Sequence, residues 1–214
     1  MLRNHGRFFG VLALILLTFS CLSVKNAKEP SDRRWRKMLK NSKEEMRLIS
    51  RKEFNIDHIK YIQRAVPDID LTEQECHELD CLPIESYSIE ESAISNWDTS
   101  KSIIPLMKLE KNKANGIVYL KDQVYFTLRL NYLNNEWHVS SGGIGRSSRL
   151  GQLCFKDKKK ISYLYVYTTN GVPITHCVVY KDKGVFKCYQ GKFDVLLVDF
   201  LKRERARYLA LNGH

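Results

Sequence analysis

The sequence predicts an α+β fold, in which N-terminal helices pack on a curved antiparallel sheet of about six strands and a C-terminal helix closes the chain. Two patterns support this prediction. Apolar residues recur at three- and four-residue spacings in the first third of the chain after the leader, as in amphipathic helices. From Gly116 onward, short runs of branched and aromatic residues alternate with turn residues, as in strands. The connections between these runs are too short for parallel crossovers.

The first helix is predicted over residues 32–53, with Ser31 as its N-cap. Its apolar stripe consists of Trp35, Met38, Leu39, Met46 and Ile49. The other faces are rich in Lys and Arg, so the helix either packs its stripe on a sheet or rests on anionic headgroups beside a membrane anchor.

Two further helices are expected before residue 84. Asp57 begins one, and Pro67 ends it. The other follows Thr72, because Thr72 and Glu75 have the spacing of a capping box. Residues 84–100 have weak periodicity and are expected to contain one helical turn.

Six strands are expected in meander order, over residues 116–120, 123–133, 136–141, 161–168, 172–180 and 185–190. The pairs "KD" and "NN" between the first three strands suit two-residue hairpin turns. The last helix follows the sixth strand, although residues 194–200 could instead form a seventh strand. Cystatin-like and nuclear-transport-factor-like cones have a similar order of elements, a likeness of fold that implies no function.

The predicted organisation has four parts. Residues 1–21 form a signal peptide, residues 22–32 a tether, residues 33–100 a helical and partly acidic segment, and residues 101–214 the antiparallel meander with the C-terminal helix. Residues 33–214 are expected to form one domain, because their number and the 43% hydrophobic content of the chain suit a single core.

The N-terminal segment has the layout of a secretion signal. Arg3 and Arg7 precede a short apolar run, and small residues follow it. The stretch "LLTFSC" resembles a bacterial lipoprotein signal, although Thr18 and Phe19 replace the small aliphatic residues usual in that motif. The resemblance implies that Cys21 becomes the lipidated first residue and that the lipid anchors the protein in the cell envelope. The alternatives are a secreted soluble chain after ordinary cleavage and a retained signal anchor.

The charge is distributed unevenly along the chain, whose net charge is +11. Residues 65–100 contain ten acidic residues and neither Lys nor Arg. Either these acids neutralise the basic remainder in the folded protein, or a basic face survives and meets anionic headgroups, polysaccharide or an acidic partner. Nucleic acid is not an expected partner, because the chain is expected to be exported and contains no nucleic-acid recognition motif.

The two cysteines beside the turn "KDKG" can be paired in two ways. A two- or four-residue loop places Cys177 directly opposite Cys188 and allows a disulfide, which an oxidising compartment would permit. A three-residue loop sends them to opposite faces of the sheet. Without Cys21 the number of cysteines is odd, so at least one does not pair within the chain.

Catalytic residues are not expected, because no hydrolase motif is present. If Cys177 were a nucleophile, the neighbouring His176 would face the other side of the strand, so His138 or His58 would have to serve as the base. The stretch "CHELDC" offers too few ligands for a metal site, so neither a metal nor another cofactor is expected.

The candidate anion site is the glycine-rich stretch over residues 140–151, with Arg146, Ser147, Ser148 and Arg149 as the expected contacts. A plain flexible connection is the alternative.

The sequence thus predicts an exported, lipid-anchored, non-catalytic envelope protein that binds a protein partner or an anionic ligand. One alternative is a small exported hydrolase with a Cys/His site in the cup of the sheet. Another is a cone that encloses a ligand in a cavity of roughly 300–1,000 Å³.

Overall fold

A computed structural model describes residues 30–53, 55–65, 69–144, 148–190 and 193–212. Residues from Asp32 onward form one compact unit. The predicted signal peptide, Cys21 and most of the tether lie outside the described residues, and so do Arg146 and Ser147.

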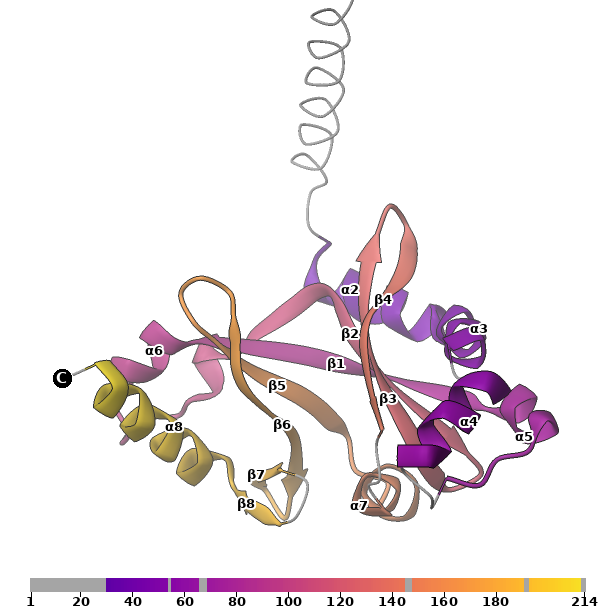
Figure 1. The fold of residues 1–214 in the computed structure, drawn as a ribbon. Coiled ribbons are helices and arrows are strands. Elements are labelled where there is room, and N and C mark those ends of the chain that lie inside the picture. The colour runs from indigo at the N-terminus through magenta and orange to yellow at the C-terminus, as the bar shows by residue number, and fades with distance from the viewer. Residues whose placement is uncertain (1–29, 54, 66–68, 145–147, 191–192, 213–214) are drawn as a thin grey trace, which may run out of the picture. The chain divides into compact units, whose positions relative to one another are not determined.

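The described chain contains an eight-stranded mixed sheet with helices around it, which confirms the α+β class (Figure 1). The strand order is β4-β3-β2-β1-β5-β6-β7-β8. The strands are β1 (Asp80–Glu90), β2 (Lys108–Leu120), β3 (Gln123–Leu133), β4 (Glu136–Ile144), β5 (Ile161–Tyr167), β6 (Pro173–Asp182), β7 (Val185–Tyr189) and β8 (Asp194–Leu196). The expected count of six strands is therefore wrong. The expected purely antiparallel sheet is also wrong, because β1 and β5 pair in parallel.

The central strand β1 lies in the segment that was expected to be helical. It joins the β2–β4 meander to the β5–β8 meander, and it is buried on both faces along most of its length (Figure 1). A strand of this kind lacks the alternation of apolar and polar residues that marks a half-exposed strand. Its proline and acids also have low strand propensity, so the sequence pattern gives no strand signal there.

The hairpin turns of the first meander agree with the sequence. Leu120 pairs with Gln123 across the turn at residues 121–122, where Lys121 has a positive φ of 53°. Asn134 and Asn135 have φ values of 52° and 66°, as a type I′ turn requires.

The helices differ from the expected positions in some details. They are α2 (Asp32–Asn41), α3 (Lys43–Glu53), α4 (Ile56–Ala65), α5 (Glu73–Glu78), α6 (Glu91–Ser95), α7 (Ser148–Gly151) and α8 (Leu197–Asn212), with a 3₁₀ turn η2 (Ile104–Leu106) and a π-helical turn η3 (Gln152–Lys156). The helix expected over 32–53 is divided at Ser42, although i→i−4 hydrogen bonds continue through that residue. The capping box at Thr72 and Glu75 is present.

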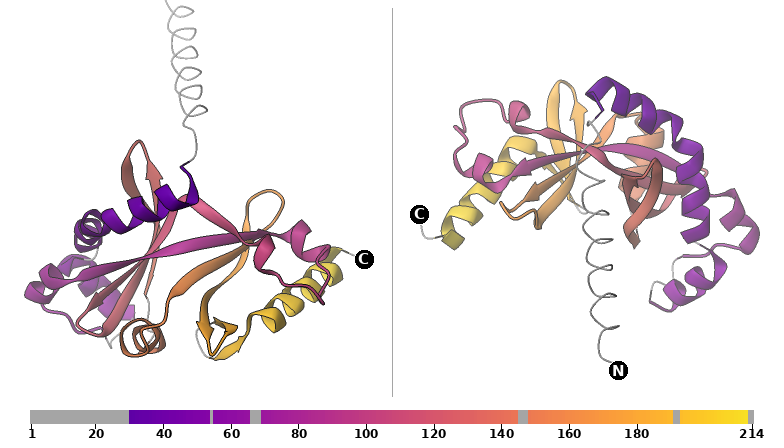
Figure 2. Two further views of the ribbon diagram at one scale, coloured as in Figure 1. Left: turned by 180° about the vertical axis from the view of Figure 1, so that it is seen from behind. Right: turned by 90° about the horizontal axis from the view of Figure 1, so that it is seen from above.

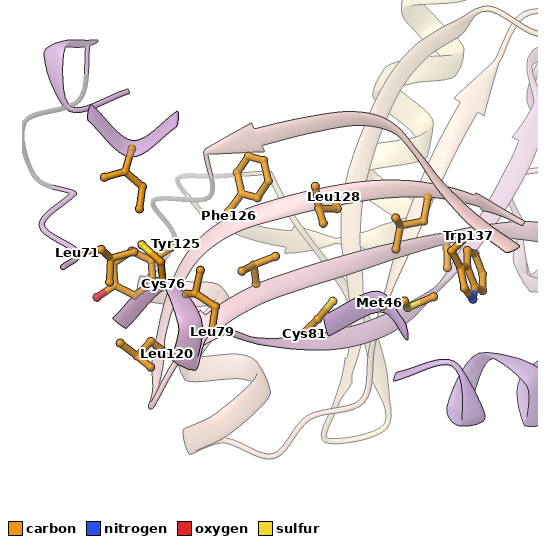
Figure 3. Packing of buried hydrophobic residues seen from close by; sticks show 14 of the residues in the cluster. Met46, Leu71, Cys76, Leu79, Cys81, Leu120, Tyr125, Phe126, Leu128 and Trp137 are labelled. Carbon is orange, nitrogen blue, oxygen red and sulfur yellow. The ribbon is translucent and has the colours of Figure 1, made fainter. Parts of the chain in front are cut away.

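Three hydrophobic clusters hold these elements together. The first packs the stripe of α2 and α3, including Trp35, Leu39 and Met46, against β1–β4 (Figure 3). The second contains η3 and the tyrosines of β5. The third packs α6 and α8 against β5–β7, near the C-terminal end of β1, whereas α5 lies at its N-terminal end (Figure 2). Because β1 contributes residues to all three clusters, the helices and strands on both sides of it pack against one shared strand.

Candidate functional site

A groove opens beside the first half of β1, where the sheet is split. Residues 86–90 of β1 pair with β5, but among the described residues the preceding stretch 80–85 pairs with β2 alone. The groove has a volume of about 530 Å³. It is lined by Arg36, Leu39, Lys40, Lys43, Leu82, Pro83, Ile84, Glu85, Cys154, Lys158, Lys159, Lys160 and Ile161.

The two sides of the groove come from distant parts of the chain. Helix α2 and the start of α3 form one side, with residues 36–43. The turn between η3 and β5 forms the other, with residues 158–161. Backbone bonds fix this turn, because the Asp157 amide donates to Gln152 (2.6 Å) and the Lys159 amide donates to Leu153 (2.8 Å). The basic residues of the second side therefore have a defined position relative to η3.

Six of the thirteen lining residues are basic, and one, Glu85, is acidic. Arg36, Lys43 and Lys159 each have an acidic partner. Within the described part of the chain, no ion pair is formed by Lys40, Lys158 or Lys160, and all three are exposed. The groove therefore carries three uncompensated positive charges, one on the helical side and two on the opposite side.

Arg36 forms a small polar network over β1. Its Nε donates to Glu85 Oε1 at 2.8 Å, and the Tyr87 hydroxyl donates to Glu85 Oε2 at 2.9 Å. Its hydrogen bond to Tyr87 and the charge of Glu85 raise the pKa of Arg36. Glu85 has only a tenth of its side chain exposed, so its charge is engaged by Arg36 and does not repel an incoming anion.

Asp80 binds Lys43 at the start of β1 in a similar way. Lys43 Nζ lies 3.2 Å from Asp80 Oδ2, and Tyr119 donates to the same oxygen at 2.9 Å. Burial raises the pKa of Asp80, but hydrogen bonds from the Cys81 amide, Tyr119 and Lys43 outweigh it, and the net shift is downward. The carboxylate is thus held ionised as a fixed partner of Lys43.

These pairs show where part of the acidic segment goes. Asp80, Glu85 and Glu90 all lie on β1, and each pairs with a basic residue from a flanking element, Lys43, Arg36 and Lys108 respectively. These acids thus neutralise some of the basic residues, as one of the two expectations stated. The unpaired groove lysines are not neutralised by them.

The floor of the groove is apolar. Leu82, Ile84 and Cys154 contribute to it, and Leu39 and Ile161 add apolar contacts from the two sides. Burial raises the pKa of the Cys154 thiol to about 12, so this cysteine is protonated at neutral pH and is a poor nucleophile. The combination of an apolar floor and basic sides suits a ligand that has both apolar groups and negative charge.

The predicted anion site at residues 146–149 is described only in part. Ser148 is exposed at the start of α7. Arg149 pairs with Asp194 (Nη2 to Oδ2, 2.5 Å) and donates to Gln152 at 3.0 Å. The groove was missed because its residues are far apart in sequence, although three consecutive lysines at 158–160 were a visible signal.

Cys177 and Cys188 form a disulfide. Neither of the two registers considered from the sequence, directly opposed cysteines or cysteines on opposite faces, is found: the turn consists of Lys183 and Gly184, both with positive φ, so Val179 pairs with Cys188. The two cysteines are diagonal neighbours with a Cα–Cα distance of 6.0 Å, within the usual range for a disulfide.

The other candidate catalytic residues are not assembled around that bond. His138 lies on β4, with four strands between it and β6 in the sheet order, and the side chain of His58 lies outside the described residues. His176 faces away from Cys177: its ring stacks on Tyr165 at 5.7 Å, in a different cluster. While Cys177 is in the disulfide, it has no thiol for nucleophilic attack.

No protein-family model, no curated protein and no solved structure matches the chain significantly. Among the described residues, no three His, Cys, Asp or Glu side chains are grouped as metal ligands. The helices in those residues are all too short or too polar to cross a membrane.

Proposed function

We propose that the protein is an exported, lipid-anchored, non-catalytic component of the cell envelope that binds an anionic partner in the basic groove. The observation that carries this proposal is the set of unpaired lysines, Lys40, Lys158 and Lys160, around an apolar floor. The disulfide and the N-terminal sequence support export, since disulfides persist in oxidising compartments.

Binding can be tested with a generic polyanion. The full chain, held in nonionic detergent, is titrated with fluorescein-labelled polyglutamate and followed by fluorescence anisotropy. We expect the triple variant Lys40→Glu, Lys158→Glu, Lys160→Glu to lose binding by about tenfold or more, because each lysine near a bound charge contributes a screened attraction of about 1 kcal/mol. Binding by the wild type should weaken with salt.

A matched control separates the groove from net charge. The triple variant Lys52→Glu, Lys181→Glu, Lys202→Glu makes the same change in net charge at exposed positions outside the groove. It should retain most of the binding. Equal losses in the two variants would show that only overall charge matters and would reject the groove as the binding site.

The anchor has its own measurement. The intact mass of the chain extracted from membranes should show a diacyl or triacyl group on Cys21. A soluble chain that begins near Val24 would contradict the anchor and leave the groove proposal to its own test.

A further inference from the structure

The groove contains an unpaired edge of β1. Beyond residue 85 toward the N-terminus, β1 has no neighbour on the β5 side within the described residues, although β2 pairs with it throughout. An unpaired edge presents backbone donors and acceptors that can pair with another extended chain. Here the edge is not at the border of the sheet but inside a lined groove, where solvent access is limited by two sides.

Two observations show which backbone groups face this edge. Pro83 has no N–H, and proline is tolerated in a strand where its nitrogen does not face a paired neighbour. The amide of Cys81 donates to its neighbour's carboxylate, Asp80 Oδ1, at 2.8 Å. Because hydrogen-bonding groups of alternate residues point to the same edge, the carbonyls of Cys81 and Pro83 face the groove. Among the described side chains, none donates a hydrogen bond to those two carbonyls.

The surroundings of this edge suit an extended chain with acidic side chains. Lys40 lies on one side of the groove, and Lys158 and Lys160 lie on the other. Acidic side chains on either side of a bound strand can therefore pair with a lysine. Leu39, Ile84 and Ile161 provide apolar contacts between them. The stretch without a β5 neighbour, residues 81–85, spans roughly 16 Å, the length of a strand of about five residues.

We propose that the groove binds an extended acidic peptide segment of a partner protein, which adds as a strand to the open edge of β1. This inference rests on the proposed function and specifies its partner. Main-chain hydrogen bonds to β1 hold the segment, and the unpaired lysines select its acids. A lipid would leave the β1 carbonyls unsatisfied, since an acyl chain offers no donor.

The probe is a synthetic peptide in which Glu alternates with Val over seven residues, capped at both ends. Two derivatives carry N-methyl groups, one on every Glu amide and the other on every Val amide. Strand addition uses the amides of only one of these sets, so methylation of that set should weaken binding by about tenfold and methylation of the other should not. The full chain in nonionic detergent is titrated with each peptide by fluorescence anisotropy.

Amide hydrogen exchange locates the bound peptide independently. The parent peptide should slow amide exchange in the segment 81–85, and it should slow alkylation of Cys154 on the groove floor. The groove triple variant should bind the parent peptide at least tenfold more weakly than the control triple variant, as the lysine charges require.

The outcomes separate this inference from the general proposal. If both methylated peptides bind as well as the parent, or vesicles containing phosphatidylglycerol bind through the same lysines while the peptide does not, strand addition is wrong and the anionic groove stands. If neither the peptide nor polyglutamate depends on the groove lysines, both proposals fail, and the lysines serve to keep the open edge from pairing with other chains.

Discussion

Gly116 on β2 makes room for the thiol of Cys81 on β1. A Cβ at position 116 would lie 2.7 Å from Cys81 Sγ and 3.5 Å from Leu130 Cδ1. Both Cys81 and Leu130 are 0% exposed, so neither can swing into solvent. Overpacking of this kind costs about 1–3 kcal/mol, partly offset by about 0.4–1 kcal/mol from the lower entropy of the unfolded chain. We therefore expect Gly116→Ala to lower the free energy of unfolding by about 1–2 kcal/mol.

A double-mutant cycle measured by urea unfolding tests the cause. Cys81→Ala removes the sulfur that the new methyl group would meet, so the cost of Gly116→Ala should nearly disappear in that background. Gly143→Ala is the control, because its nearest neighbour, Thr127 Oγ1, is 3.7 Å away, an ordinary contact. The reasoning is refuted if Gly116→Ala costs the same with and without the Cys81 sulfur.

Two further predictions concern the β6–β7 hairpin. Breaking the Cys177–Cys188 disulfide, whose cysteines are 11 residues apart, should cost about 3 kcal/mol of stability, the entropy of a loop of that length. Urea midpoints with and without dithiothreitol measure this, and a wild type insensitive to the reductant would contradict it. Hydrogen bonds from Lys187 and Lys159 lower the pKa of Asp182 to about 2. Because the folded pKa is depressed, the stabilisation is present above the ordinary pKa near 3.9 and is lost as the pH falls toward 2. Asp182→Asn should remove this part of the acid dependence of unfolding, and parallel profiles of wild type and variant over pH 2–5 would argue against it.

Local chemistry explains what the sequence could predict. The asparagines at 134–135 and the capping box at Thr72 act over two to four residues, and both are found in the structure. The apolar stripe of α2 and α3 was also visible, because Trp35 and Met46 keep a helical spacing across the division at Ser42. Signals of this range need no knowledge of the rest of the fold.

The parts that escaped prediction depend on distant residues. β1 is recognisable as a strand only when its pairing with β2 and β5 is known, and the parallel pairing begins at Tyr163, far along the chain. The groove also depends on distant residues, since Lys40 and Lys160 line the same groove only where β1 and β5 diverge in the folded protein. The periodicity of a single segment carries no information about contacts between residues that are far apart in the sequence.

The parallel pairing of β1 with β5 also has a consequence for the order of folding. Each meander is made of neighbouring hairpins, whose strands close short loops and can form early. Joining Ser86 to Tyr163 closes a loop that contains the whole of β2–β4, and this loses more chain entropy. We therefore expect the two meanders to form as separate units and the seam between them to close last. The split beside β1 would then be the part of that seam that never closes, and a partner strand there would complete it.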